Sequence, residues 1–287
     1  MPIILALVIG SVFIKQWPQL VKVFEEVNIW WVIGGLCSYF INYCLRGCRI
    51  KTISNVNLHL FPDAVHVACL HGLITYLLPL RTGDLSLPVI LKSVAKIDIR
   101  AGSKILLTIR MLDISILGFL TLLAAIFSHV VIGFFVKILW ISIGLGMIFA
   151  PAVLKCFSKY GQLLRISFVT KISKFGNLRP IGLKEIFQTF GIWFAVGCSL
   201  FCTVRAIGLP LNPLDIWFIV TIQLPMQLMP VQGIANSGNH EGGWIAALLL
   251  LGYTASEGLK IALASHTILL FYVILLSPII WLTKKEK

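Results

Sequence analysis

Long apolar runs separated by short polar segments dominate the sequence. A helix needs about 20 mostly apolar residues to cross the hydrocarbon core of a bilayer. Six of the runs approach or exceed that length, and we predict that they are membrane-spanning helices. Their expected boundaries are about 2–16, 28–46, 104–128, 133–157, 184–205 and 259–283.

Two further apolar regions contain helix breakers. Residues 62–91 are interrupted at Pro79 and Pro88, and residues 213–252 at Pro225 and at a later stretch rich in Gly and Asn. Irregular backbone at membrane depth survives only where protein buries it or where it lines a water-filled cavity. We therefore predict that each region is a re-entrant hairpin, which enters and leaves the membrane on one side.

The distribution of Lys and Arg agrees with this topology. Basic residues collect after the second run (Arg46, Arg49 and Lys51), between residues 92 and 104, in the loop 158–184 and in the C-terminal KKEK. Cytoplasmic loops carry an excess of Lys and Arg. All four segments face the cytoplasm if the first hairpin enters from inside and the second from outside. The expected fold is an all-α polytopic membrane protein with six spanning helices, two Pro/Gly-broken hairpins and both termini in the cytoplasm.

Short sequence matches suggest an internal duplication. The matching segments recur in the same order, 29–40 (IWWVIGGLCSYF) with 192–201 (IWFAVGCSLF) and 104–110 (KILLTIR) with 260–266 (KIALASH). We predict one membrane domain, 1–287, made of repeats 1–128 and 129–287. Because the halves begin on opposite sides, this is an inverted-topology repeat, as is common in secondary transporters. The alternative is coincidence between apolar segments of similar composition.

Composition supports the membrane class. Hydrophobic residues make up 58% of the chain and charged residues 12%, whereas soluble domains average about 45–50% and about 25%. The net charge of +13 would suggest nucleic acid for a soluble protein. Here the basic residues lie in short loops, where they attract anionic lipid head groups. We expect membrane lipids as partners and no nucleic acid.

Five charged residues fall within or beside apolar regions, and we predict that they form a polar site. They are Arg81, Asp84, Arg110, Asp113 and Glu241. An Arg or Asp at the centre of a membrane helix costs roughly 2.5–3.5 kcal/mol on insertion scales. Together they would cost on the order of 10 kcal/mol if they faced lipid. We therefore expect them to face inward, near one another or near water.

The first hairpin contains the elements of an anion site. Pro79 ends a helix, Gly83 lets the chain turn, and a half-helix begins near Leu85–Pro88 with Asp84 as its N-cap. The amides at a helix N-terminus favour an anion. The planar fork of Arg81 grips phosphate or carboxylate through two hydrogen bonds.

The second hairpin repeats this logic, and several roles stay open. Pro230 breaks the chain, and Glu241 stands where a new helix begins. Glu241 and Asp84 could either cap or pair structurally or act on a substrate. Arg110 and Asp113 share one helix face. They could form a structural ion pair, or Asp113 could orient Arg110 toward a substrate.

Motifs for the commonest cofactors and metals are missing from the sequence. The stretch HEGGW lacks the second His of a metalloprotease helix, and there is no P-loop and no Gly-x-Ser-x-Gly elbow. The seven cysteines are scattered singly, without zinc spacing. We expect no cofactor, no metal and no enzymatic activity.

Four motifs resemble the lysylphosphatidylglycerol synthase transmembrane family. LRGCRIK, LPLRTGDLSLP, IRMLD and MPVQGIANSGNHEGG occur in the family's order over roughly residues 40–280. The family's Pro-Gly-Arg-x-Gly-Glu appears here with Leu80 and Asp84 in place of its first Gly and its Glu. The acidic residue that usually precedes Arg110 is Ile109, and the second hairpin loop is longer than usual.

This resemblance implies a flippase-like protein, here a stand-alone member without the aminoacyltransferase domain. It implies transfer between leaflets of a lipid with a phosphate-bearing head group, a polyprenyl-phosphate sugar or a modified phospholipid. Glycosyltransferases of the same pathway would be partners, and the cell (inner) membrane the location. Arg81, Arg110 and Arg46 would hold the head group during alternating access. Asp84, Asp113 and Glu241 would position the arginines or carry coupling protons.

Two other functions remain open. An intramembrane transferase could use Asp84 or Glu241 as its catalytic carboxylate. A transporter of small organic anions could use the same fold without recognising a lipid tail.

Overall fold

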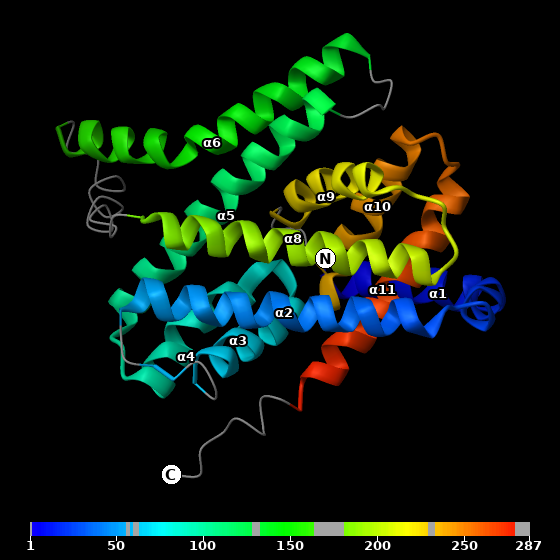
Figure 1. The fold of residues 1–287 in the computed structure, drawn as a ribbon, viewed down its shortest axis with the longest axis horizontal. Coiled ribbons are helices and arrows are strands. Elements are labelled where there is room, and N and C mark those ends of the chain that lie inside the picture. Colours follow the sequence, from blue (N-terminus) through cyan, green and yellow to red (C-terminus); the bar gives the residue numbers. More distant parts are fainter. Residues whose placement is uncertain are drawn as a thin grey trace.

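The fold is helical throughout the residues that a computed structural model describes, 2–55, 58–59, 63–127, 133–163, 181–228 and 233–278 (Figure 1). In chain order the elements are α1 (Pro2–Glu25), α2 (Ile29–Ser54), α3 (Val65–Leu77), η2 (Pro79–Leu85), α4 (Ser86–Ala95), α5 (Ile99–Phe127), α6 (Phe134–Leu163), α8 (Leu183–Ala206), α9 (Pro213–Leu228), η3 (Ile234–Asn236), α10 (Asn239–Leu250) and α11 (Ala255–Leu276), where η marks a 3₁₀ helix.

Four helices are long and apolar enough to cross a membrane, which supports a polytopic membrane protein. They are α5, α6 over Phe134–Val153, α8 and α11. Helices α1 and α2 cover the other two predicted spans. The count of six crossings and the sidedness of the termini stay predictions. The predicted basic loop 158–184 falls mostly outside the described residues.

The second predicted span is longer than expected. Helix α2 continues to Ser54 and ends at Asn55, whose φ of 52° is left-handed. The prediction that Arg46, Arg49 and Lys51 lie in a loop is therefore wrong. Arg49 is buried, because its guanidinium finds a carboxylate on α5.

Both irregular regions are pairs of helices joined by a 3₁₀ turn. Helices α3 and α4 pack against each other on either side of η2, and α9 and α10 pack likewise around η3. The break at Pro79 is present, but Pro88 lies buried in the first turn of α4, where a missing N–H costs nothing. Helix α9 also continues through position 225, and Pro230 lies outside the described residues. That the hairpins are re-entrant stays a prediction.

The two halves show the same order of elements and related packing. Helices α2 and α8 run antiparallel side by side (Figure 1), since Arg49 reaches Thr189 near one end and Gly35 meets Ser199 toward the other. Helix α1 packs on α11, and α6 packs on α5. The elements η2 and η3 contact each other, so the breaks of the two hairpins meet. The duplication itself stays a prediction.

Each hairpin belongs to an apolar core of its own. One contains Val65, Leu87 and Leu91 and joins α2, α3, α4 and α5. The other surrounds Trp244 and Leu248 and joins α8, α9, α10 and α11. The hairpins are thus each anchored in apolar packing, while their broken ends, η2 and η3, contact each other.

The turn in the first hairpin depends on a close approach at Gly83. A Cβ there would clash with the backbone of Thr75 and lie 2.6 Å from the carbonyl oxygen of Ile74. Backbone atoms of a helix cannot shift as a side chain can. We expect Gly83→Ala to lower stability by about 1–3 kcal/mol or more, measured as thermal unfolding in detergent.

Gly197→Ala is the matched control, because nothing lies within 4 Å of its Cβ in α8. Ala favours a helix by up to about 1 kcal/mol over Gly, so this variant should match or exceed the wild type. Equal stability of the two variants would contradict the importance of the close approach between Gly83 and the backbone of α3.

Candidate functional site

A cavity of about 200 Å³ lies where the hairpins meet. One water needs only about 10–15 Å³ of such a cavity, so the space is large enough for a polar head group. Polar or aromatic residues from both halves line it: Tyr39, Asn42, Tyr43, Arg46, His71, Thr75, Tyr76, Arg81, Arg110, Trp193, Ser199, Gln223, Asn236 and His240.

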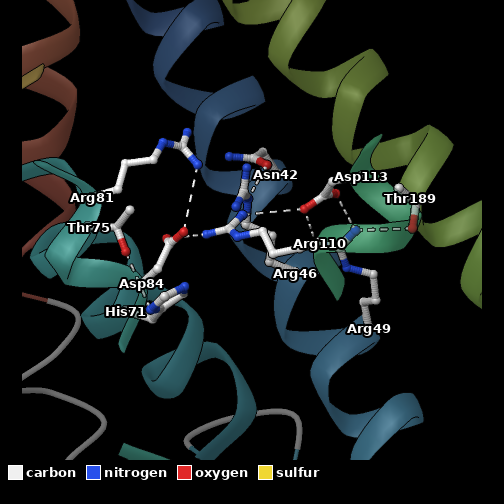
Figure 2. A network of polar contacts seen from close by, with 10 residues as sticks. All are labelled: Asn42, Arg46, Arg49, His71, Thr75, Arg81, Asp84, Arg110, Asp113 and Thr189. Carbon is white, nitrogen blue, oxygen red and sulfur yellow. Dashed lines mark hydrogen bonds and ion pairs between the residues drawn. The ribbon is translucent and has the colours of Figure 1, made fainter. Parts of the chain in front are cut away.

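Three of the predicted arginines converge on this cavity. Arg46 comes from α2, Arg81 from η2 and Arg110 from α5 (Figure 2). Their guanidinium groups approach one another from three segments that are far apart in the sequence. The structure therefore brings together the three side chains that the sequence analysis assigned to substrate.

Two predicted carboxylates, those of Asp84 and Asp113, form ion pairs with Arg81 and Arg110 but not with Arg46. Asp84 forms an ion pair with Arg110 and a longer one, 3.7 Å, with Arg81. Asp113 pairs with Arg110 at 3.5 Å and with Arg49 at 2.6 Å (Figure 2). Neither carboxylate lines the cavity. The expected N-cap role of Asp84 is wrong: Leu85 caps α4 without a side-chain bond, because Asp84 turns to the arginines instead.

Arg49 is a site residue that the sequence analysis missed. Its side chain is only 2% exposed, and it donates to both oxygens of Asp113, at 2.6 and 3.3 Å, and to Thr189 Oγ1 at 3.1 Å. These bonds join α2 to α5 and α8. Asn42, Arg46 and Arg49 are spaced i, i+4 and i+7, which places them on one helix face. That spacing was the available signal.

The backbone of η2 aims Arg81 at the cavity. Leu80 and Arg81 both have left-handed conformations, with φ of 57° and 56°. Non-glycine residues rarely adopt this conformation, and it persists only where the surroundings enforce it. The hydroxyl of Thr82 donates to the carbonyl of Pro79 at 2.8 Å and closes the turn. Two consecutive residues in this strained conformation indicate that the turn serves to position its side chains, Arg81 among them.

The network carries excess positive charge. Four guanidinium groups, of Arg46, Arg49, Arg81 and Arg110, face the two carboxylates of Asp84 and Asp113. Arg46 has no acidic partner among the described residues, and its Nε donates to Asn42 Oδ1 at 2.9 Å. Two positive charges are thus left without a counter-charge beside the cavity.

Glu241 is not part of this network. One of its oxygens shares a hydrogen bond with His266 Nδ1, and the other accepts the backbone N–H of Gly238 at 2.7 Å. The second ring nitrogen of His266 donates to the carbonyl of Ala235 at 2.9 Å. The prediction that Glu241 positions an arginine is wrong, because His266 occupies its free oxygen. A role in carrying protons stays a prediction.

The pairs Asp84–Arg110 and Glu241–His266 occupy corresponding positions in the two predicted repeats. The match of KILLTIR with KIALASH aligns Arg110 with His266. In each half, an acid that follows the hairpin break reaches a base on the next long helix. Each hairpin is thus fastened to α5 or α11 by one acid–base pair.

The fold and site together define a helical membrane protein in which two broken hairpins meet at a basic cavity. The family described as Lysylphosphatidylglycerol synthase TM region matches residues 3–277. The chain belongs to this family of membrane proteins, which are often flippase-like. Comparison with curated proteins and with solved structures gives no significant match. Among the described residues, no three side chains converge as metal ligands.

The buried Arg49–Asp113 pair makes a stability prediction. Removing one partner of a buried ion pair typically costs about 3–5 kcal/mol, since the other charge is left uncompensated. We expect Asp113→Asn to lower the free energy of unfolding by that order, measured in detergent micelles. The double variant Arg49→Met, Asp113→Leu should be more stable than either single change. An Asp113→Asn protein as stable as the wild type would contradict this role.

Proposed function

We propose that the protein is a lipid flippase of the cell (inner) membrane, with both termini in the cytoplasm. It would move a lipid with a phosphate-bearing head group, a polyprenyl-phosphate sugar or a modified phospholipid, between leaflets by alternating access. The family match supports a membrane protein that is often flippase-like. Glycosyltransferases that make or use such a lipid are the partners this proposal implies.

The excess positive charge beside the cavity carries the proposal. Uncompensated charges are costly in a low-dielectric interior, by several kcal/mol for each ion. An anion in the cavity would remove that cost. Arg46 lines the cavity without an acidic partner among the described residues, and Arg forks match phosphate oxygens in geometry. The site is therefore arranged for an anion.

The long Arg81–Asp84 contact suggests how the binding of a head group is coupled to the first hairpin. At 3.7 Å this ion pair is weak, and a phosphate oxygen would compete for Arg81 in a closer geometry. Because Arg81 belongs to η2, and η2 contacts η3, a head group held by Arg81 acts at the junction of the two hairpins. Movement of this junction relative to α5 and α11 is the conformational step we propose. The tail would stay in the surrounding lipid.

Native mass spectrometry of the gently purified protein tests this function. We expect one phosphate-bearing lipid to be enriched over bulk lipid in the wild type. Loss of a charge-assisted contact costs about 1.5–3 kcal/mol, so Arg81→Ala should reduce the enrichment at least tenfold. Membrane insertion should be unchanged.

Arg100→Ala is the matched control, since Arg100 is an exposed residue in the first turn of α5. It should retain the lipid. Bulk lipid alone, equal in all three proteins, would contradict the flippase proposal. A chemically converted lipid would favour an intramembrane transferase, and binding of a small anion without a tail would favour an anion transporter.

A substitution at Arg46 distinguishes a loss of lipid binding from a loss of stability. Its charge has no acidic partner among the described residues, so Arg46→Gln relieves repulsion from neighbouring arginines. We expect this variant to be as stable as the wild type or more stable in thermal unfolding, yet to lose the enriched lipid. A variant that is strongly destabilised would show that Arg46 is structural.

A further inference from the structure

The cavity has a second wall that the anion site does not use. It comes from the second half of the chain, with Trp193 on α8, Gln223 on α9 and His240 on α10. Gln223 is 3% exposed and His240 is 1% exposed. Gln223 Nε2, His240 Nδ1 and Trp193 Nε1 are all buried atoms without a hydrogen-bond partner among the described residues. Buried polar atoms normally have hydrogen-bond partners, so three unpaired nitrogen atoms on one cavity wall point to a ligand.

The tautomer of His240 follows from its neighbour. The hydroxyl of Ser265 donates its one proton to the carbonyl of Ala262 at 2.9 Å. His240 Nε2 lies 2.9 Å from the same hydroxyl oxygen, so Nε2 must be the donor in that bond. In the neutral ring, Nδ1 is then an unprotonated acceptor. The wall therefore offers donors from Gln223 and Trp193 and an acceptor from His240.

The cavity offers no counter-charge for a cation. None of its lining residues is acidic. Among the nearby carboxylates of the described residues, Asp84 and Asp113 are held by arginines and Glu241 is held by His266. An ammonium group in the head group would lie between the arginines and an uncharged wall. It would be repelled by the first and unpaired at the second.

We propose that the wall formed by Trp193, Gln223 and His240 is a hydroxyl subsite. The head group is then a phosphate that bears an uncharged polyol, such as a sugar or a glycerol, and no ammonium. A hydroxyl both donates and accepts, which satisfies His240 together with Gln223 or Trp193. This inference rests on the proposed function, because it assumes that a lipid phosphate occupies the arginine side of the same cavity.

Three lipids with identical acyl chains test this inference in native mass spectrometry of the delipidated protein. Phosphatidylglycerol carries phosphate and hydroxyls, phosphatidylpropanol keeps the phosphodiester and three carbons without hydroxyls, and phosphatidylethanolamine carries an ammonium. We expect phosphatidylglycerol to bind about three- to tenfold more tightly than phosphatidylpropanol, the size of effect that one or two hydrogen bonds give. Phosphatidylethanolamine should bind most weakly.

Variants of the wall provide the second arm. Gln223→Met removes one donor with little change in volume, and Trp193→Phe removes the other while keeping an aromatic ring. Both should bring the ratio of phosphatidylglycerol to phosphatidylpropanol affinity close to one while phosphatidylpropanol affinity stays the same. Gln188→Met is the matched control, since Gln188 bonds Thr52 away from the cavity. It should keep the wild-type ratio.

The outcomes separate this inference from the proposed function. Equal affinity of the wild type for phosphatidylglycerol and phosphatidylpropanol would overturn the hydroxyl subsite and leave the anion site standing. Binding of phosphatidylethanolamine as tight as that of phosphatidylglycerol would overturn the exclusion of ammonium. Phosphatidylcholine with the same acyl chains serves as the bulk-lipid reference. If none of the three lipids binds more tightly than this reference, and Arg46→Gln leaves all the affinities unchanged, the proposed function fails as well. The comparison of lipids uses the wild type, so it holds even if a wall variant does not fold.

Discussion

The carboxylate of Asp113, held between Arg49 and Arg110, is the contact on which the site depends. It joins α2 to α5, and the bond from Arg49 to Thr189 extends the connection to α8. Without Asp113, the arginines of α2 and α5 would repel one another in an interior that screens charge poorly. With it, four guanidinium groups can lie in one region, although two carboxylates do not neutralise them. The same contact thus fixes the helices and leaves the cavity electrically positive.

The hairpins turn this positive region into a cavity. Each is anchored by its own apolar core, and their breaks meet at η2 and η3. The first hairpin contributes the cationic side through Arg81, and the second half contributes uncharged nitrogen atoms through Gln223 and His240. A cavity lined by charged residues from one half and by uncharged, hydrogen-bonding residues from the other suits a head group with two chemically different parts. That division follows from the order of the chain, because each half supplies one wall.

Much of the organisation was predictable from sequence, because apolar runs and breakers are local signals. The position of the helices, the break at Pro79 and the inward placement of Arg81, Arg110 and Asp113 all follow from the cost of placing polar groups in lipid. Pro88 was misassigned as a break because the first turn of a helix tolerates proline. Arg49 was assigned to a loop because its partner Asp113 lies 64 residues away, and tertiary pairs of this kind leave no local pattern. The partner of Glu241 was missed for the same reason.

The two acid–base pairs that fasten the hairpins differ in one respect that their equivalent positions conceal. Arg110 lines the cavity, whereas neither Glu241 nor His266 is among the residues that line it. An anion in the cavity can therefore compete with Asp84 for Arg110, but it does not meet the bond between Glu241 and His266. The first hairpin is fastened by a contact that a ligand can reach, and the second by a contact between two buried side chains. A ligand thus has direct access to the fastening of one hairpin only.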